Sequence, residues 1–493
     1  MTGNADLKSR MNFSVSEITS LKDIPKGAHI HVIGVCGVAM AQMAILLSQQ
    51  GYQVSGSDKE FYEPMGGLLR NSKVTLKQGY SASNLEGQID LVVIGNVVSA
   101  GHEEALEVER RKIPYTIFPK LLHELIIEGR HSMVVSGTHG KTTTSAMWAC
   151  VLRELLQDPA YFVGGAALDL PSSLSLGGKK FSVVEGDEYD SAFFAKVPKF
   201  SFYRPDTLIV TSVEYDHADI YPDLAAINSE FDKLVLGLPQ GARAIVCVDG
   251  DNLRALYNSW KSRAKCELIS YGKSEAEWKL ESCTQTGASQ EVRARDKNGN
   301  ALQFSLNIPG SYNALNALAV AIACESCGFD RRAVVEALAS FHGVKRRQEV
   351  RFKKDGLVVI EDFAHHPTAV RETITGVKQA YPQHKLIAIF EPRSNTSRRK
   401  VFQNDYVQAF SMANQVHLFE VALRHNDSPD DLIDVGTLAS EISATGTPAQ
   451  TFKDVSAKTK ELALFKSEKI VILVMSNGSF GGLLEKLLKE LEG

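Results

Sequence analysis

Short apolar segments of strand length alternate with segments of helical length along most of this chain. His31 to Gly37 is a β-rich run that ends in glycines, and the apolar spacing from Val38 to Gln50 is typical of a helix. Ser132 to Ser136 is another strand-length run, and a helical pattern through Leu156 follows it. Strands that repeatedly alternate with helices predict parallel sheets with helices packed on their faces. The chain is therefore expected to fold as an α/β protein.

The length of the chain indicates how many such units it holds. At about 150 residues per domain, 493 residues correspond to about three domains. We expect Rossmann-like first and third domains around a central phosphate-loop domain with a mainly parallel sheet. The expected divisions are a polar leader at residues 1–28 and domains at residues 29–129, 130–342 and 343–493.

The composition restricts the class of protein. Apolar residues make up 44% of the chain and charged residues 23%, with a net charge of −4, which excludes a disordered chain and a basic protein that coats nucleic acid. Seven scattered cysteines predict reduced thiols in a cytoplasm, and we expect Cys324 and Cys327, in an Ala-rich helical run, to pack in the core rather than bind zinc. The longest apolar runs, such as Ile470 to Met475, are far shorter than the roughly 20 residues of a membrane span. A cytoplasmic protein with no membrane or nucleic-acid partner is expected.

The strongest local motif is Gly-Thr-His-Gly-Lys-Thr at residues 137–142, between a strand and a helix. A glycine-rich turn at this place lets backbone N–H groups surround phosphate groups. Lys141 would neutralise the β- and γ-phosphates, and the Thr142 hydroxyl would bind Mg²⁺. The general phosphate-loop pattern has a further glycine where this chain has Val135, so the motif is matched only in part. The alternative is a chance Gly-Lys-Thr sequence in an ordinary loop.

Acidic residues follow two later strands of the same unit. Glu185 to Asp190 contains four carboxylates at the end of an apolar strand, where open α/β sheets bind ligands. Because Mg²⁺ prefers oxygen ligands, these carboxylates are candidates for a metal site, although a solvated acidic loop would have the same composition. Ser212 to Asp219 follows the next strand, and its His217 is either a metal ligand or a hydrogen-bonded loop histidine. Together with the phosphate loop, the two clusters predict a nucleotide and metal site.

A glycine-containing turn near the amino end indicates a second ligand site. Gly34, Gly37 and Met40 lie between a strand and a helix, and Asp58 follows about 20 residues later, where it could hold a ribose. The middle glycine of Gly-x-Gly-x-x-Gly is missing, and Met40 lies near the place of the last one. The pattern indicates a nucleotide or diphosphate at a helix amino end, not specifically a nicotinamide cofactor. Tight packing of the strand on the helix is the alternative.

With these motifs in order, the chain resembles the Mur ligases of peptidoglycan synthesis over nearly its whole length. These enzymes use ATP to join an amino acid or a peptide to a UDP-muramyl precursor. Ordered matches across three domains are more specific than any single motif. The matching segments are Gly34-x-x-Gly37-x-x-Met40, Gly56-Ser-Asp58, Gly137-Thr-His-Gly-Lys-Thr-Thr143, Glu185-x-Asp-Glu-x-Asp190, Asp216-His217, Tyr312-Asn313-x-x-Asn316-Ala317, Arg346-Arg347 and Glu361-Asp362-Phe-Ala-His365-His366-Pro367.

The resemblance implies a role for each domain. The first would bind the UDP moiety, the central ATPase domain would bind ATP and Mg²⁺, and the third would bind the incoming amine and close on the nucleotide. Lys141, Glu185 and His217 would be catalytic, and Thr142 would join Glu185 and His217 as metal ligands. The implied ATP-binding residues are Gly137, Thr138, His139, Gly140, Lys141, Thr142, Thr143, Asn313, Asn316, Arg346, Arg347 and Asp362, and the implied UDP-sugar-binding residues are Gly34, Gly37, Met40 and Asp58.

Segments of the third domain predict the incoming substrate. Glu391-Pro-Arg-Ser-Asn-Thr396 and Met475 to Gly482 are most similar to the family members that join L-Ala-γ-D-Glu-meso-diaminopimelate to UDP-N-acetylmuramate in murein recycling, through an acyl phosphate. The alternative within the family is the ligase that adds L-alanine to the same UDP-sugar in de novo synthesis. Arg393, Ser394 and Asn395 are candidates for binding the peptide carboxylates. In the alternative interpretation, Arg393, Arg398, Arg399 and Lys400 form a solvated basic face. A monomer or weak dimer is expected.

Two other classes of function share parts of this pattern. A nicotinamide-dependent dehydrogenase would use the first domain, but the departure from the glycine pattern at Met40 argues against it. A nucleotide switch or scaffold would use the phosphate loop, but Asp362 and the paired arginines far downstream argue against that class.

Overall fold

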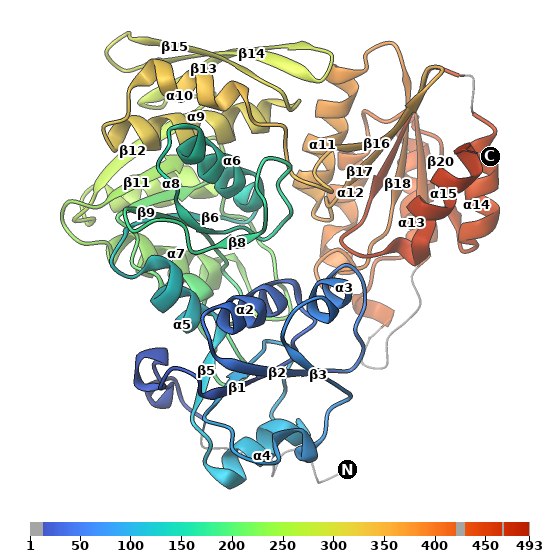
Figure 1. Ribbon diagram of the computed structural model, residues 1–493. Helices are drawn as coiled ribbons and strands as arrows, with labels where there is room; N and C mark the ends of the chain where they lie inside the picture. Colours follow the sequence, from blue (N-terminus) through green and yellow to red (C-terminus); the bar gives the residue numbers. More distant parts are fainter. Residues whose placement is uncertain (1–12, 421–428, 466–467, 493) are drawn as a thin grey trace.

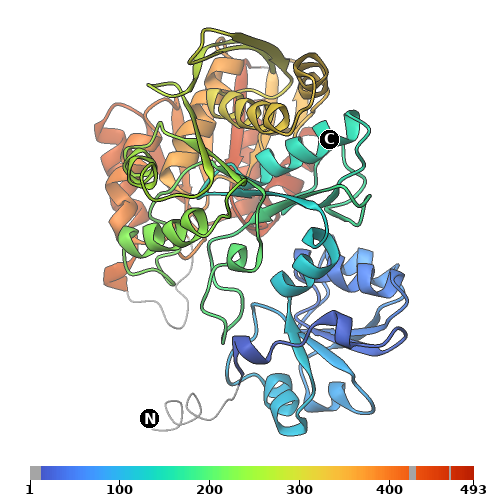
Figure 2. The ribbon, with the colours of Figure 1, turned by 90° about the vertical axis from the view of Figure 1, so that its left-hand side faces the viewer.

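The computed structural model describes residues 13–420, 429–465 and 468–492. They form three α/β domains in chain order, each built around its own sheet (Figure 1). The first domain lies below the other two in this view, and it still projects away from them when the molecule is turned (Figure 2). The predicted α/β class, with three domains in series and mainly parallel sheets, is confirmed. Within the described ranges, no helix combines the length and the apolar character needed to cross a membrane.

The first domain has a five-stranded parallel sheet in the Rossmann-type order β3-β2-β1-β4-β5. Ile30, Val32 and Leu91 on the central strands are fully buried, as expected for parallel strands covered on both faces. The strands are β1 (His29–Ile33), β2 (Gln53–Asp58), β3 (Thr75–Gln78), β4 (Leu91–Ile94) and β5 (Tyr115–Ile117), and the helices are α2 (Val38–Gln49), α3 (Met65–Arg70), α4 (Glu103–Arg111) and α5 (Phe118–Leu122).

The central domain has a ten-stranded sheet in the order β15-β14-β13-β12-β11-β10-β6-β9-β7-β8. Strand β6 lies between β9 and β10 and is parallel to both. Strands β13, β14 and β15 run antiparallel at the edge farthest from the first domain (Figure 1), and β14 alternates exposed and buried residues because only one of its faces is covered. The strands are β6 (His131–Ser136), β7 (Ala160–Phe162), β8 (Leu174–Ser175), β9 (Phe181–Gly186), β10 (Thr207–Val210), β11 (Arg243–Cys247), β12 (Glu267–Gly272), β13 (Trp278–Thr286), β14 (Ser289–Asp296) and β15 (Ala301–Leu306), and the helices are α6 (Lys141–Glu154), α7 (Leu224–Leu236), α8 (Asp251–Trp260), α9 (Ser311–Ser326) and α10 (Arg331–Ala339).

The third domain has a six-stranded sheet in the order β16-β17-β21-β18-β19-β20, parallel except for β16. All six residues of β21 are buried, which explains its unbroken apolar sequence. The strands are β16 (Glu349–Lys354), β17 (Leu357–Asp362), β18 (Lys385–Phe390), β19 (Gln415–Phe419), β20 (Ala449–Phe452) and β21 (Ile470–Met475), and the helices are α11 (Pro367–Ala380), α12 (Gln403–Ala409), α13 (Val435–Ala444), α14 (Val455–Ala463) and α15 (Leu483–Glu492).

Part of the expected leader packs against the folded domains. The ring centroid of Phe13 lies 4.6 Å from that of Tyr115 in β5 and 5.3 Å from that of Phe194, and Leu21 is buried. Phe194 belongs to the central domain, so this aromatic cluster joins the first two domains. Residues 1–12 of the expected leader lie outside the described residues.

Cys324 in α9 and Cys327, which directly follows that helix, lie against the core of the central domain. Cys324 is fully buried and Cys327 is half-buried against the same core. All seven cysteines, which fall within the described ranges, are free thiols. This placement agrees with the expected packing role of the pair.

A fully buried histidine in β19 makes the stability of the third domain sensitive to acid. Burial, and then the charge of Lys458, lower the pKa of His417 to about 4, while the amide nitrogen of Gln450 lies 3.3 Å from Nε2. In an unfolded chain the pKa of a histidine is about 6.5. Between these values the unfolded chain binds the proton more strongly than the folded one, so the free energy of unfolding decreases as the pH falls from about 6.5 toward 4.

His417→Gln should remove this contribution, because glutamine does not titrate. We expect the apparent unfolding temperature of the wild type to fall further between about pH 7 and about pH 5 than that of the variant, as measured by differential scanning calorimetry. The remaining histidines titrate in both proteins, so the difference isolates His417. Equal decreases in the two proteins would show that His417 is not the source.

Candidate active site

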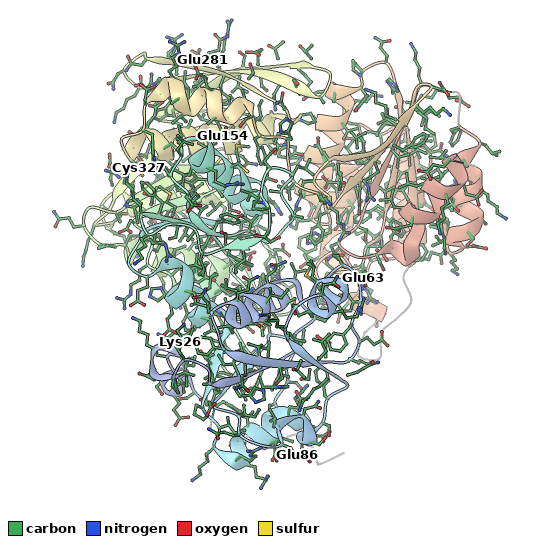
Figure 3. All side chains as sticks on the ribbon, in the orientation of Figure 1. Lys26, Glu63, Glu86, Glu154, Glu281 and Cys327 are labelled. Atoms are coloured by element: carbon green, nitrogen blue, oxygen red, sulfur yellow. The ribbon has the colours of Figure 1, made fainter. Side chains whose placement is uncertain are left out.

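One cavity of about 1960 Å³ lies where the three domains meet. Its walls include loops that follow three neighbouring strands in each sheet: β2, β1 and β4, then β9, β6 and β10, then β17, β21 and β18. Within each sheet these strands are parallel, so their carboxyl ends open toward the same side. Glu63, which lines the cavity, lies where the first domain faces the third (Figure 3).

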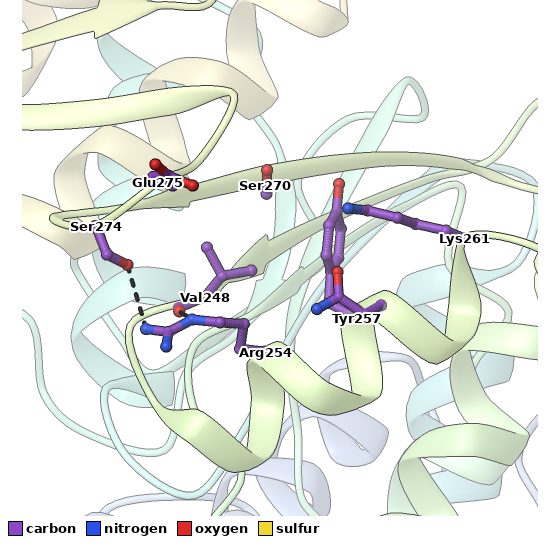
Figure 4. Close-up of a pocket in the computed structure, with 8 residues that line it drawn as sticks. Val248, Arg254, Tyr257, Lys261, Ser270, Ser274 and Glu275 are labelled. Carbon is purple, nitrogen blue, oxygen red and sulfur yellow. Dashed lines mark hydrogen bonds between the residues drawn. The ribbon is translucent and has the colours of Figure 1, made fainter.

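A smaller pocket of about 430 Å³ lies beside α8 of the central domain (Figure 4). Its Arg254 guanidinium donates to the carbonyl oxygens of Val248 at 2.9 Å and Asp249 at 3.1 Å. These bonds show that Arg254 holds the loop after β11 in place. None of the residues around this pocket belongs to the motifs of the phosphate loop or the acidic clusters. The cavity between the domains is therefore the candidate site.

Two glycines shape the phosphate loop. Gly137 and Gly140 have φ values of 134° and 81°, in the region that favours glycine. A Cβ on Gly137 would lie only 2.3 Å from Thr211 Oγ1 and 2.8 Å from the carbonyl oxygen of Ser212. Helix α6 begins directly after Gly140, so the unpaired N–H groups of its first turn are placed to receive an anion from the cavity.

Lys141 is a buried cation at the start of α6. Its Nζ donates to the carbonyl oxygen of Gly137 at 2.7 Å and pairs with Glu188 at 2.7 Å. Burial alone would lower the pKa of Lys141, but the charges of Glu188, Asp187 and Glu185 outweigh it and raise the pKa. Lys141 therefore stays protonated in the folded protein.

Glu188 also pairs with His217, and Thr396 of the third domain contacts the backbone of His217. His217 Nε2 lies 3.1 Å from the Glu188 carboxylate, and its backbone N–H donates to the Thr396 hydroxyl oxygen at 3.0 Å. Burial alone would lower the pKa of His217, but the hydrogen bond and charge of Glu188, and then Asp216, raise it to about 9. Buried Lys141, buried Glu188 and half-buried His217 thus form a row of positive, negative and positive charges.

Thr142 and Glu185 supply oxygen atoms beside this row. The Thr142 hydroxyl donates to Glu185 Oε1 at 2.8 Å, and the Gly164 N–H donates to Oε2 at 2.8 Å. Glu185 lies inside β9 rather than after it, and burial, followed by the charge of Asp187, raises the pKa of its carboxyl group. A bound cation would stabilise the carboxylate, so the donor set fits Mg²⁺. His217 is held by Glu188 and would have to leave that partner to bind a second ion.

The two consecutive arginines have different partners. Arg347 Nη2 lies 3.4 Å from Thr142 Oγ1, across the boundary between the third and central domains. Arg346 Nε lies 2.8 Å from Glu361, and its Nη2 donates to the carbonyl oxygen of Ser476 at 3.0 Å. Of the predicted pair, Arg347 is therefore placed at the phosphate loop, whereas Arg346 holds loops of the third domain together.

The other residues predicted to bind nucleotide lie around the same loop. A Cβ on Gly140 would lie 3.0 Å from Asn316 Oδ1, so Asn316 directly faces the glycine. Asn313 donates to a backbone carbonyl one turn earlier at 2.6 Å. Asp362 is buried at the end of β17 and accepts the N–H of Gln348 at 2.8 Å. All three predicted side chains belong to residues that line the cavity.

In the first domain, Gly34, Gly37 and Met40 line the cavity but Asp58 is not among the residues of its wall. The Asp58 carboxylate is turned toward the loop after β1 and accepts the Cys36 N–H at 2.7 Å. Asp58 therefore shapes the glycine-containing loop, and its direct contact with a ribose stays a prediction.

Arg393 to Asn395 line the cavity on the side of the third domain. Gly478 leaves room for Arg393, because a Cβ at that position would lie 1.7 Å from Nη1. The amide of Asn395 donates to a carboxylate of the central domain at 2.9 Å. Arg398, assigned in the alternative interpretation to a solvated basic face, is buried.

Some residues of the site have no motif that marks them. Lys199 is buried in the wall of the cavity, pairs with Asp187 at 3.0 Å and donates to the Tyr189 hydroxyl oxygen at 2.9 Å. Its position shortly after the acidic run is the only signal in the sequence. Glu188 belongs to that run, but the sequence does not indicate its bonds to Lys141 and His217.

Comparisons with known proteins identify the family. Residues 29–130 match the Mur ligase family, catalytic domain, residues 135–324 the Mur ligase middle domain, and residues 346–478 the Mur ligase, glutamate ligase domain. The UDP-N-acetylmuramate–L-alanyl-γ-D-glutamyl-meso-2,6-diaminoheptandioate ligase of Escherichia coli is 35% identical over 93% of this chain and 97% of its own. The murein peptide ligase of Psychrobacter arcticus has a TM-score of 0.69 at 29% identity, and the UDP-N-acetylmuramate–alanine ligase of Thermotoga maritima has 0.76 at 25%, each over 94% of this chain and 99% of its own.

The chain belongs to the Mur ligase family. It is therefore an ATP-dependent ligase that forms amide bonds in peptidoglycan metabolism, which confirms the resemblance seen in the motifs.

Gly137→Ala should damage the phosphate loop, because the added methyl group would meet Thr211 and Ser212. We expect kcat/KM for ATP to fall by about 100-fold, since displacements of about 1 Å at a reacting centre have effects of that size. Gly241→Ala is a matched control: Gly241 also has a positive φ, of 90°, but a Cβ there meets nothing within 4 Å. Steady-state phosphate release would measure both variants, and equal losses would contradict the steric explanation.

Proposed function

We propose that this enzyme joins L-alanyl-γ-D-glutamyl-meso-diaminopimelate to UDP-N-acetylmuramate in murein recycling, with ATP and Mg²⁺. The observation that supports this reaction is the single cavity that contains the glycine-containing loop of the first domain, the phosphate loop of the central domain and Arg393 of the third domain. The relative in Escherichia coli carries the name of this activity and matches the chain over almost its whole length.

The first chemical step would activate the acid. An amine cannot expel an oxide from a carboxylate at neutral pH, so the lactyl carboxylate would attack the γ-phosphorus of ATP and form an acyl phosphate, and ADP would leave. Both reactants are anions, so the step depends mainly on position and charge cancellation. Lys141 precedes Thr142, Arg347 lies beside it, and both side chains would bind the phosphate oxygens. Bound Mg²⁺, held by Thr142 and Glu185, would supply further positive charge to the phosphates.

When Lys141 binds a phosphate, it exchanges Glu188 for a new partner, and the remaining charges of the site can accommodate this change. When a phosphate binds Lys141, Glu188 loses one partner but remains paired with His217. A buried carboxylate without a partner would cost several kcal/mol, so His217 keeps Glu188 ionised during the reaction. The amine of the peptide would then attack the acyl carbon, the carbon–oxygen bond to the phosphate would break, and inorganic phosphate would leave.

The charge of the third-domain side favours a peptide. The tripeptide carries several carboxylates, and the guanidinium of Arg393 matches a carboxylate with two parallel hydrogen bonds. The L-alanine ligase of Thermotoga maritima shares the fold, so the fold alone does not distinguish the two substrates.

A comparison of amine substrates tests the specificity. With UDP-N-acetylmuramate and ATP held constant, kcat/KM for the tripeptide should exceed that for L-alanine by at least about 100-fold, because L-alanine lacks the additional carboxylates that the site would bind. Phosphate release with each substrate omitted in turn gives the background. A preference for L-alanine would overturn the assignment, and equal phosphate release in all mixtures would argue against ligation.

Lys141→Ala should lower turnover by at least about 1000-fold, because a preorganised cation at the phosphates is lost. Binding of UDP-N-acetylmuramate should stay nearly unchanged, since the first domain is expected to hold that ligand. The double variant Lys141→Ala/Glu188→Gln also removes the negative charge that Lys141 balances, and Lys196→Ala, at an exposed lysine that pairs with Asp190, is the control. Isothermal titration calorimetry measures the binding of UDP-N-acetylmuramate, and phosphate release measures turnover. Full activity of the Lys141 variants would exclude Lys141 from the mechanism.

A further inference from the structure

His139 of the phosphate loop converges with Glu214 and His366, and the steps proposed above use none of these three side chains. His139 Nε2 lies 3.4 Å from Glu214 Oε2, and His366 Nδ1 lies 3.6 Å from the same oxygen. All three ligand atoms lie within 4.8 Å of one another. His139 and Glu214 belong to the central domain, and His366 precedes α11 of the third domain, so the cluster spans the boundary between two domains.

The hydrogen bonds around the cluster leave a lone pair on His366 Nδ1 and orient the Glu214 carboxylate, as metal binding requires. His366 Nε2 lies 3.2 Å from the carbonyl oxygen of Tyr215, which places the proton on Nε2 and leaves the lone pair on Nδ1 facing Glu214. The Thr368 hydroxyl donates to Glu214 Oε2 at 2.6 Å and orients the carboxylate. Outer contacts of this kind, from histidine to carbonyl and from hydroxyl to carboxylate, accompany metal ligands in proteins.

One atom of the cluster lacks a hydrogen-bond partner. His139 Nε2 is buried and makes no hydrogen bond, although Glu214 is near it. A buried polar atom left unsatisfied is costly, and an unrecorded ion is a recognised explanation. The three residues all line the large cavity, so an ion from solvent can reach them.

We propose that His139, Glu214 and His366 form a zinc-binding site separate from the Mg²⁺ site. Zinc bonds of about 2.0–2.1 Å place tetrahedral ligands about 3.4 Å apart, close to the two distances to Glu214. Two imidazoles with one carboxylate suit Zn²⁺ rather than Mg²⁺, which prefers oxygen ligands alone. The fourth position would be open to water from the cavity.

Binding would have a mechanical consequence for the enzyme. An ion at this site would join the phosphate loop, through His139, to the third domain, through His366. The ion would replace the 3.3 Å hydrogen bond from the Thr368 N–H to His366 Nδ1. Zinc would therefore stabilise the docked arrangement of the two domains, and the unfolding temperature should rise with zinc concentration.

The test uses the full chain, freed of metal by a chelator and supplied with excess Mg²⁺. Titration with Zn²⁺ in a calorimeter should show one zinc ion per wild-type chain, and Co²⁺ in place of Zn²⁺ should give the strong visible absorption of a four-coordinate ion. His366→Asn removes the imidazole but keeps a side-chain cap for α11. It should weaken zinc binding by at least about 100-fold, since loss of an outer contact alone costs about 10- to 100-fold.

Two further variants locate the ion. Glu214→Gln keeps the size of the side chain and should also weaken zinc binding, whereas His217→Ala, which alters the Mg²⁺ side of the cavity, should leave it within about threefold of wild type. Circular dichroism verifies the folding of each variant. The proposal is overturned if the folded wild type binds no zinc, if His366→Asn and Glu214→Gln bind it as tightly as wild type, or if His217→Ala alone loses it.

Discussion

The parallel direction of the central strands determines where the chemistry of this protein can lie. In each domain a central strand, β1, β6 or β21, lies between two parallel neighbours whose following loops also reach the cavity. Most polar residues of the site lie in the loops at the carboxyl ends of these strands, because the strands themselves are largely buried. Glu185 and Asp362 lie within the last two residues of their strands. Since the three sheets are docked with these ends toward one cavity, residues far apart in the sequence meet at one place.

Burial of charge explains how the central part of the site is organised. A buried ammonium group must have an opposite charge beside it, and Glu188 provides that charge for Lys141 while it also pairs with His217. Thr396 connects this row to the third domain through the backbone of His217. At the same domain boundary Arg347 lies near Thr142. The contacts that dock the third domain on the central domain therefore lie next to the phosphate loop.

The sequence was sufficient to predict the features that depend on residues close together along the chain. The phosphate loop lies between β6 and α6 as predicted, because its glycines and flanking segments determine that turn. The pairing of Lys141 with Glu188, 47 residues away, was not predictable, and neither was the bond between Thr396 and Asp216 across 180 residues. Such contacts depend on how the strands are ordered and how the domains dock. The hydrogen bond from the Cys36 N–H to Asp58 was not predictable either, because it depends on how the loop after β1 packs.

The central claim is that one active site is assembled from three domains. The most direct test is a crystal structure of the chain with a non-hydrolysable ATP analogue, Mg²⁺ and UDP-N-acetylmuramate. The account predicts that the phosphates of the nucleotide contact both Lys141 and Arg347, while the UDP moiety lies at the loop from Gly34 to Gly37. A nucleotide that contacts only the central domain, with Arg347 turned away, or a UDP moiety bound outside the shared cavity, would contradict it.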